Sequence, residues 1–206
     1  MNGRRSLVAV SRSSRRGFLV ASVWATAGLA LGCGRRAAGG DGKAAAAAVT
    51  IVEFSDTGER LRTRTVPRLV RSDAAWRAQL STLAYRVTRD HGTERAFSGA
   101  LLAEHRPGVF RCIGCDTALF DAASKYESGT GWPSFRQPIA RENVVQTRDR
   151  SLGMLRTAVS CARCDAHLGH VFDDGPPPTG LRYCINSVAL RFAPAPERAA
   201  RPGAAA

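Results

Sequence analysis

Apolar and polar residues alternate over short stretches along most of the chain after residue 48, which is the pattern of β-strands buried on one face. One stretch has a helical period instead, because Ser72 can cap a helix that places Trp76, Leu80 and Leu83 together on one core-facing side. Many short strands with one helical region near the front predict an α+β fold that is mainly antiparallel. The stretches expected to form strands are 49–54, 62–70, 108–112, 143–147, 154–161 and 181–192.

The last of these stretches carries a cysteine in a polar setting. Successive side chains of a strand point to opposite faces, so Arg182, Cys184 and Asn186 share one face, while positions 181, 183 and 185 can pack inward. A thiol beside a guanidinium and an amide suits a reactive thiolate better than it suits a core. We therefore predict that Cys184 is a nucleophile.

Two C-x-x-C pairs have the spacing of metal-binding knuckles, Cys112 with Cys115 and Cys161 with Cys164. Each pair comes where a predicted strand ends in a turn, and four thiolates at such corners can surround Zn²⁺ tetrahedrally. Because the long segment 116–160 separates the pairs, this structural zinc would clamp distant parts of one domain together.

Two other uses of these cysteines stay open. An exported protein can carry two disulfides instead of a metal. Alternatively, His167 and His170 could complete a local site with Cys161 and Cys164, which would leave the first cysteine pair without a role. Four soft thiolate ligands explain all four cysteines and leave both histidines available for chemistry.

The basic composition carries less information than its size suggests. The formal charge is +13, but Lys43 and Lys125 are the only lysines, and five of the arginines lie within residues 1–33. This is a compositional bias towards arginine, and we interpret it as a solvated basic surface on a monomer, with no nucleic-acid partner.

The amino-terminal segment has the features of an export signal. Residues 14–20 read S-R-R-G-F-L-V, a twin-arginine signature, and an uncharged stretch follows that is short and weakly apolar for a membrane span. The sequence A-L-G-C at 30–33 is similar to a lipoprotein cleavage box ending at Cys33. We therefore expect an extracytoplasmic protein anchored to the membrane, with an uncleaved anchor or plain signal cleavage as alternatives.

These features divide the chain into five parts. Residues 1–33 form the signal, and the Gly- and Ala-rich residues 34–48 form a flexible tether. An extension of strands covers 49–71, the main domain covers 72–193, and a disordered tail covers 194–206.

Four motifs follow one another along the main domain: C-x-x-C at 112–115, S-G-T-G-W-P-S-F at 128–135, H-L-G-H-V-F at 167–172 and R-Y-C-I-N-S at 182–187. With these motifs, the chain from about Ser72 to Phe192 resembles the B-type methionine sulfoxide reductases. The resemblance is specific because all four motifs occur in the right order and spacing.

The resemblance implies two small antiparallel sheets that form a barrel-like core, with short N-terminal helices, a shallow active-site basin and a zinc clamp on the far side. It also implies reduction of the R epimer of methionine sulfoxide, in oxidised peptides or proteins, to methionine. The activity would be that of a peptide-methionine (R)-S-oxide reductase in the repair of oxidative damage.

The chemistry can be reasoned from the residues themselves. A Cys184 thiolate, favoured by Arg182, would attack the electrophilic sulfur of the sulfoxide and would be left as a sulfenic acid. The sulfoxide oxygen must gain protons, and His170 and His167 are natural donors. A structural hydrogen-bonding role is the alternative for both histidines.

Three further residues complete the predicted site. Asn186 would fix the geometry by hydrogen bonding, and Trp132 would offer an apolar wall to the methyl group of the substrate. Phe172 would shape the same wall. The alternative for Trp132 is a core aromatic residue.

One departure from the family pattern affects recycling. Many members carry a resolving cysteine in the loop before W-P-S-F, where this chain has Thr130. We therefore expect a thioredoxin-like protein or a small thiol to reduce Cys184 directly. The competing hypotheses are a non-enzymatic zinc-binding interaction module, which has no use for Cys184, and an acyl hydrolase, for which no oxyanion-hole signature is present.

Overall fold

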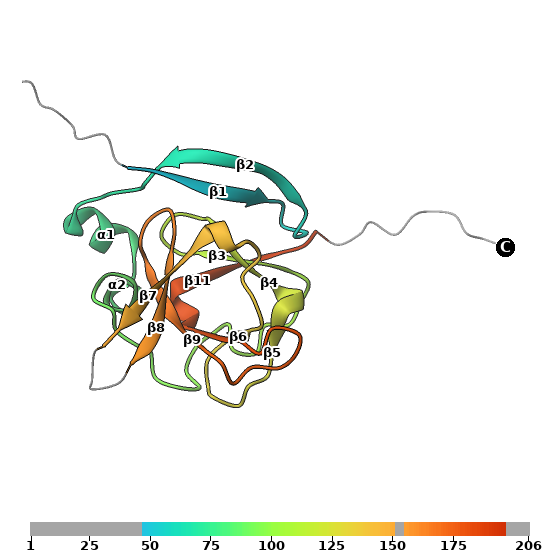
Figure 1. The fold of residues 1–206 in the computed structure, drawn as a ribbon. Helices are drawn as coiled ribbons and strands as arrows, with labels where there is room; N and C mark the ends of the chain where they lie inside the picture. Colours follow the sequence, from blue (N-terminus) through green and yellow to red (C-terminus); the bar gives the residue numbers. More distant parts are fainter. Residues whose placement is uncertain (1–46, 151–154, 197–206) are drawn as a thin grey trace, which may run out of the picture. The chain divides into compact units, whose positions relative to one another are not determined.

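Short antiparallel strands and two short helices make up residues 47–150 and 155–196, which are the residues that the computed structural model describes. They lie in the compact unit that spans residues 43–206. The elements, in chain order, are β1 Ala48–Phe54, β2 Arg60–Pro67, α1 Asp73–Gln79, α2 Thr82–Arg89, β3 Gly108–Cys112, β4 Ala118–Asp121, η1 Ala122–Ser124, β5 Lys125–Tyr126, β6 Ser134–Phe135, η2 Arg141–Asn143, β7 Val144–Asp149, β8 Arg156–Cys161, β9 His167–Phe172, β10 Arg182–Ile185, η4 Ser187–Ala189 and β11 Leu190–Pro194 (Figure 1).

The strands form three antiparallel sheets within the described ranges. β1 and β2 make a separate hairpin, six strands form a sheet in the order β5-β6-β10-β9-β8-β7, and three form a sheet in the order β11-β3-β4. The predicted class, mainly antiparallel β with short helices near the front, is therefore confirmed.

The predicted barrel-like core of two sheets is not what the structure shows. A barrel closes only when its edge strands pair with each other. β5 and β7 stand at opposite ends of the six-stranded sheet, and neither pairs with a further strand in the described part of the chain. The three sheets stay separate and pack against one another.

The helical region contains two short helices, in agreement with the short N-terminal helices that the resemblance implied, although the apolar spacing alone had indicated one. Ser72 Oγ accepts a hydrogen bond from Ala75 N and caps α1, as predicted. Ser81 Oγ accepts one from Ala84 N and caps α2, so a second helix begins there in a new direction. The prediction that Leu83 belongs to the core is wrong, because the second cap turns it outward and 40% of the side chain is exposed.

The core joins the two larger sheets through three aromatic rings. Phe110 of β3, Phe120 of β4 and Phe135 of β6 are all fully buried. The ring of Phe135 stacks on Phe120 with centroids 4.4 Å apart and meets Phe110 edge-on at 5.0 Å. Such contacts are favourable aromatic geometries, and they fix the three-stranded sheet against the six-stranded one.

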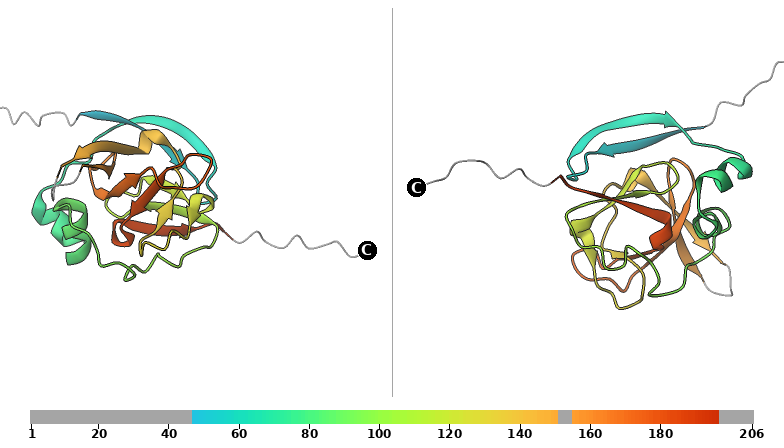
Figure 2. Two further views of the ribbon diagram at one scale, coloured as in Figure 1. Left: turned by 60° about the horizontal axis from the view of Figure 1, so that its bottom comes forward. Right: turned by 180° about the vertical axis from the view of Figure 1, so that it is seen from behind.

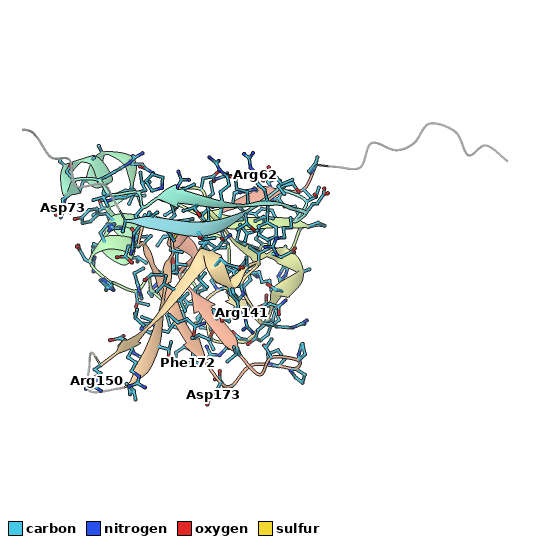
Figure 3. All side chains as sticks on the ribbon, turned by 45° about the horizontal axis from the view of Figure 1, so that its top comes forward. Arg62, Asp73, Arg141, Arg150, Phe172 and Asp173 are labelled. Carbon is cyan, nitrogen blue, oxygen red and sulfur yellow. The ribbon has the colours of Figure 1, made fainter. Side chains whose placement is uncertain are left out.

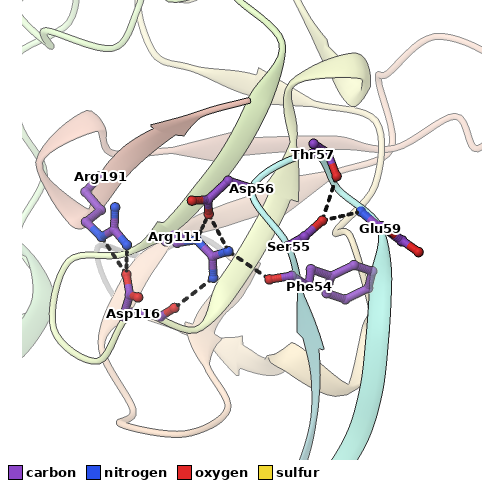
Figure 4. Close-up of polar contacts among 8 residues, drawn as sticks. All are labelled: Phe54, Ser55, Asp56, Thr57, Glu59, Arg111, Asp116 and Arg191. Carbon is purple, nitrogen blue, oxygen red and sulfur yellow. Dashed lines mark hydrogen bonds and ion pairs between the residues drawn. The ribbon is translucent and has the colours of Figure 1, made fainter. Parts of the chain in front are cut away.

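The β1–β2 hairpin lies against one end of the described domain in every view (Figure 2). Asn143, which is fully buried, bonds through its side-chain amide to both backbone polar groups of Val52 and to Ala118 O. Arg111 of β3 donates to Phe54 O at 2.8 Å and pairs with Asp56 in the hairpin turn (Figure 4). The extension predicted before residue 72 is thus built into the domain by specific polar contacts.

Several predictions about the ends of the chain concern residues outside the described ranges. They are the export signal of 1–33, almost all of the tether of 34–48, and most of the tail of 194–206. Within residues 47–150 and 155–196, no helix is both long and apolar enough to span a membrane.

Candidate active site and four-cysteine cluster

Cys184 lies inside the six-stranded sheet, on β10 between β6 and β9. In register it stands opposite Ser134 of β6 and His170 of β9. Directly opposite residues of an antiparallel pair project from the same face, so the thiol and the imidazole lie on one side of the sheet. The predicted alternation is present, because Tyr183 and Ile185 are buried on the other face.

A cavity of about 120 Å³ opens beside Cys184. Gly169 contributes to its lining and allows β9 and β10 to come close, because a Cβ there would lie 2.1 Å from Cys184 O. Phe172, on its wall, lies at the end of the domain opposite Arg62 of the hairpin (Figure 3). The full lining is Thr93, Trp132, Arg156, Gly169, His170, Phe172, Cys184 and Asn186. Five predicted site residues therefore meet here, whereas His167 and Arg182 are not part of the lining.

His170 is held by a carboxylate that the sequence analysis did not identify. Its Nε2 lies 2.8 Å from Asp149 Oδ2, and Arg156 contacts the same oxygen at 2.9 Å. Asp149 and Arg156 face each other in the register of β7 and β8. Asp149 lies just beyond the stretch 143–147 that was expected to form a strand, and only the pairing of strands shows which histidine it reaches.

His167 lies behind His170, with ring centroids 5.3 Å apart. Only 2% of His167 is exposed, and neither ring nitrogen has a hydrogen-bond partner among the described residues. Burial, with smaller contributions from the charges of His91 and His170, lowers the pKa of His167 to about 4. The ring is therefore neutral at pH 7 and is a poorer proton donor than the sequence suggested.

A buried glutamate, also missed from the sequence, ties the cavity residues together. The Glu94 carboxylate accepts hydrogen bonds from the backbone N–H groups of Ser187 at 2.6 Å and Val188 at 3.0 Å. Glu94 N donates to Asn186 Oδ1 at 2.9 Å, and Glu94 O accepts from the indole of Trp132 at 3.2 Å. Asn186 also donates from Nδ2 to Leu168 O, so its amide mainly holds the site together.

Burial dominates the electrostatics of Cys184. Removal from water raises the pKa of the thiol, and the hydrogen bond with Thr130 and the charge of Arg182 lower it by less. Arg182 makes two hydrogen bonds to Asp174, at 2.8 and 2.7 Å, and its guanidinium lies over the ring of Phe172. The charge of Arg182 thus favours the thiolate, but its effect on the pKa is smaller than that of burial.

The four knuckle cysteines meet at the other end of β8. Their sulfur atoms all lie within 4.8 Å of one another. The closest approaches join the two knuckles, with Sγ atoms of Cys112 and Cys164 3.6 Å apart and those of Cys115 and Cys161 3.5 Å apart. Hydrogen bonds with Cys115 and the other two thiols raise the pKa of Cys112 well above its usual value. Four thiolates this close therefore need a cation among them.

The two knuckles are built in the same way although their sequences differ. In the first, Asp116 N donates to Cys112 O at 2.9 Å, and in the second Asp165 N donates to Cys161 O at the same distance. Both aspartates have positive φ, 65° and 61°, a conformation that aspartate tolerates better than most residues. Cys112 ends β3 and Cys161 ends β8, so the cluster joins the two larger sheets.

This arrangement fits zinc better than it fits disulfides. Tetrahedral Zn–S bonds of about 2.3 Å separate the sulfur atoms by roughly 3.8 Å, close to the spacing observed. A disulfide would bring two sulfurs to about 2.05 Å, and the five cysteines in the described residues are all free thiols. The alternative metal site, in which His167 and His170 join Cys161 and Cys164, is also disfavoured, because His170 lies in the cavity beside Cys184.

Comparisons with known proteins agree on one family. The SelR domain matches residues 80–194. A peptide methionine sulfoxide reductase MsrB of Pseudomonas entomophila is 60% identical over 119 residues, which cover 58% of this chain and 91% of that protein. The MsrB of Azotobacter vinelandii is 55% identical over 130 residues, covering 63% of this chain and 98% of the relative. That of Bradyrhizobium diazoefficiens is 52% identical over 127 residues, covering 62% and 91%.

We predict that the purified protein holds about one zinc per chain, and that Cys112→Ser loses the metal and much of its thermal stability together. The reason is that a structural zinc contributes roughly 10–16 kcal/mol of apparent binding free energy in small peptides. Elemental analysis and thermal unfolding measure the two effects. Cys184→Ser, on β10 two strands away from β8, is the control and should keep its zinc. A metal-free wild type whose melting temperature is unaffected by a chelator would contradict this assignment.

We also predict that Cys184 is mainly a thiol at pH 7. Because burial raises its pKa, the rate of alkylation by iodoacetamide at Cys184, followed by mass spectrometry, should rise with pH through a midpoint above about 8.5, the value of a free cysteine. Arg182→Gln should move the midpoint higher because it removes the charge that favours the thiolate. Arg60→Gln, on the exposed hairpin, should leave it unchanged. A wild-type midpoint below pH 7 would show that charge, not burial, dominates.

Proposed function

Because this chain belongs to the SelR-domain family of MsrB peptide methionine sulfoxide reductases, we propose that it reduces the R epimer of methionine sulfoxide in peptides and proteins. The observation that carries the proposal is the placement of Cys184 directly opposite His170 in a cavity with aromatic walls. A non-enzymatic zinc module remains the alternative function, and it gives this cavity no role.

The cavity suits the side chain of methionine sulfoxide. Trp132 and Phe172 provide apolar surface for the methyl and methylene groups, while Cys184 and His170 provide polar groups on the same lining. The indole nitrogen of Trp132 is bonded to Glu94 O, which fixes the ring as a wall. One end of the substrate is then held by apolar contact and the other by hydrogen bonding.

The chemical step moves one oxygen atom. The sulfur of Cys184 attacks the sulfoxide sulfur and forms an S–S bond. The oxygen is then transferred to the sulfur of Cys184, so that the S–O and S–S bonds to the substrate both break and methionine is released beside a Cys184 sulfenic acid. Cysteine is oxidised by two electrons and the sulfoxide is reduced by two. The proton lost by the thiol balances the proton gained by the oxygen, so a resting thiol in a buried site already carries the proton that the reaction needs.

His170 is the residue best placed to move that proton. An ionised Asp149, 2.8 Å from Nε2, fixes the ring so that Nε2–H points to the carboxylate and Nδ1 is available for proton exchange. His167, neutral and buried behind it, supports the ring from one side. We therefore assign the proton transfer to His170 and a packing role to His167.

Recycling requires an external thiol. Thr130 Oγ1 lies 3.9 Å from Cys184 Sγ, at the position where many relatives of this kind carry a second cysteine, and a hydroxyl cannot form a disulfide. The other cysteines in the described residues are those of the four-cysteine cluster. Two external thiols would convert the sulfenic acid to the thiol, a disulfide and water. A small thiol or a thioredoxin-like protein fits this requirement.

The direct test uses a peptide with either epimer of methionine sulfoxide and dithiothreitol as reductant. The wild type should reduce the R epimer, and Cys184→Ser should show no measurable turnover. Asp149→Asn should lower kcat by about tenfold or more with little change in KM, because it leaves binding intact and removes the group that orients His170.

Asp173→Asn is the matched control, since Asp173 is an exposed carboxylate at the same end of the domain (Figure 3). It should have the activity of the wild type. Equal rates on the two epimers, or full activity in Cys184→Ser, would overturn the proposed function.

A further inference from the structure

Phe97 is an exposed aromatic residue held in a strained backbone conformation beside the cavity. The residue is 69% exposed, whereas Phe110, Phe120 and Phe135 are fully buried. Its φ is 62°, in the left-handed region that phenylalanine disfavours and that glycine or asparagine adopts more readily. Strain and exposure together are costs without a benefit to folding, which points to a function for the side chain.

Phe97 is fixed to the loop that forms one wall of the cavity. Phe97 N donates to Gly131 O at 2.8 Å, and a Cβ on Gly131 would lie 2.9 Å from the edge of the Phe97 ring. The ring of Phe97 therefore packs directly against the backbone of Gly131. The next residue is Trp132, which lines the cavity, and the preceding one is Thr130, which contacts Cys184.

A second connection makes the two segments one wall. Three residues before Phe97, Glu94 O accepts the hydrogen bond of the Trp132 indole, and Thr93 lines the cavity itself. Segments 93–97 and 131–132 are thus joined at both ends by hydrogen bonds. Phe97 is itself exposed and is not part of the cavity lining, so its ring extends this wall outside the lining.

We propose that Phe97 is a docking platform for the polypeptide on either side of the oxidised methionine, and that it favours peptide-bound over small substrates. This inference rests on the proposed function. A cavity of about 120 Å³ takes one side chain, so the neighbouring residues of a peptide must lie on its rim. An extended chain advances about 3.3 Å per residue, so residues one or two positions from the sulfoxide come within reach of the ring.

The comparison that tests this pairs a small substrate with a peptide. N-acetyl-methionine-R-sulfoxide amide and a ten-residue peptide with a central methionine-R-sulfoxide between apolar residues are reduced with dithiothreitol. Phe97→Asn suits the left-handed backbone but lacks the ring. It should raise KM for the peptide about tenfold, which is the effect of losing one well-packed aromatic contact. The kcat for the peptide, and both kcat and KM for the small substrate, should stay within about twofold of the wild-type values.

Two further variants separate docking from structure. Phe97→Tyr keeps the ring and should retain the preference for the peptide. Val70→Asn removes another highly exposed apolar side chain, outside the cavity lining, and should leave kcat and KM for both substrates unchanged. The melting temperature of Phe97→Asn should equal or exceed that of the wild type, because relief of strain offsets the loss of a mostly exposed ring.

The outcomes distinguish the two levels of the argument. A wild type that reduces neither substrate would overturn the proposed function and this inference together. An active wild type whose preference for the peptide survives Phe97→Asn would overturn the inference alone. Equal losses of activity on both substrates in Phe97→Asn would also overturn it, because the ring would then shape the cavity. A loss of activity seen only when a thioredoxin replaces dithiothreitol would overturn it too, because the ring would then bind the reductant.

Discussion

The close approach of four thiols is the constraint on which the rest of the structure depends. The cluster joins the end of β3 to the end of β8, and so holds the three-stranded sheet against the six-stranded sheet. β8 runs from Arg156, which lines the cavity, to Cys161, which belongs to the cluster. Its pairing with β7 places Asp149 opposite Arg156, and its pairing with β9 places His170 opposite Ala158. The four-cysteine cluster at one end of β8 is therefore connected, through this strand and its partners, to Asp149 and His170.

The active site depends on burial as much as on charge. A thiol next to an arginine invites the interpretation that the cation creates a thiolate. However, the guanidinium of Arg182 is hydrogen-bonded to Asp174, and desolvation raises the pKa of Cys184 by more than the charge of Arg182 lowers it. The same desolvation keeps His167 neutral. A site that holds its proton on sulfur in the resting state suits a reaction whose leaving oxygen must be protonated. Low dielectric surroundings also strengthen the bond between Asp149 and His170.

Local patterns in the sequence predicted the parts of this structure that depend on local chemistry. The spacing of the cysteine pairs predicted the cluster, and alternation predicted the two faces of β10. Contacts between distant strands could not be predicted this way. Asp149 and Glu94 act on residues far along the chain, and nothing in their own neighbourhood shows which residues they reach. Asn143, which fixes the hairpin, was missed for the same reason. The split of the helical region had a local signal, Ser81, but the apolar spacing across it favoured one helix.

In the proposed reaction, the substrate oxidises Cys184, and no cysteine outside the four-cysteine cluster is available among the described residues to form a disulfide with it. The most direct test starts from a reduced protein that begins near residue 49, which excludes Cys33. One equivalent of a peptide carrying methionine-R-sulfoxide is added without reductant, followed by dimedone and peptide mapping by mass spectrometry. We expect a dimedone adduct on Cys184, and in Thr130→Cys we expect a disulfide between Cys184 and the introduced thiol instead. A disulfide between Cys184 and any cysteine of the cluster in the unmutated sequence would contradict it.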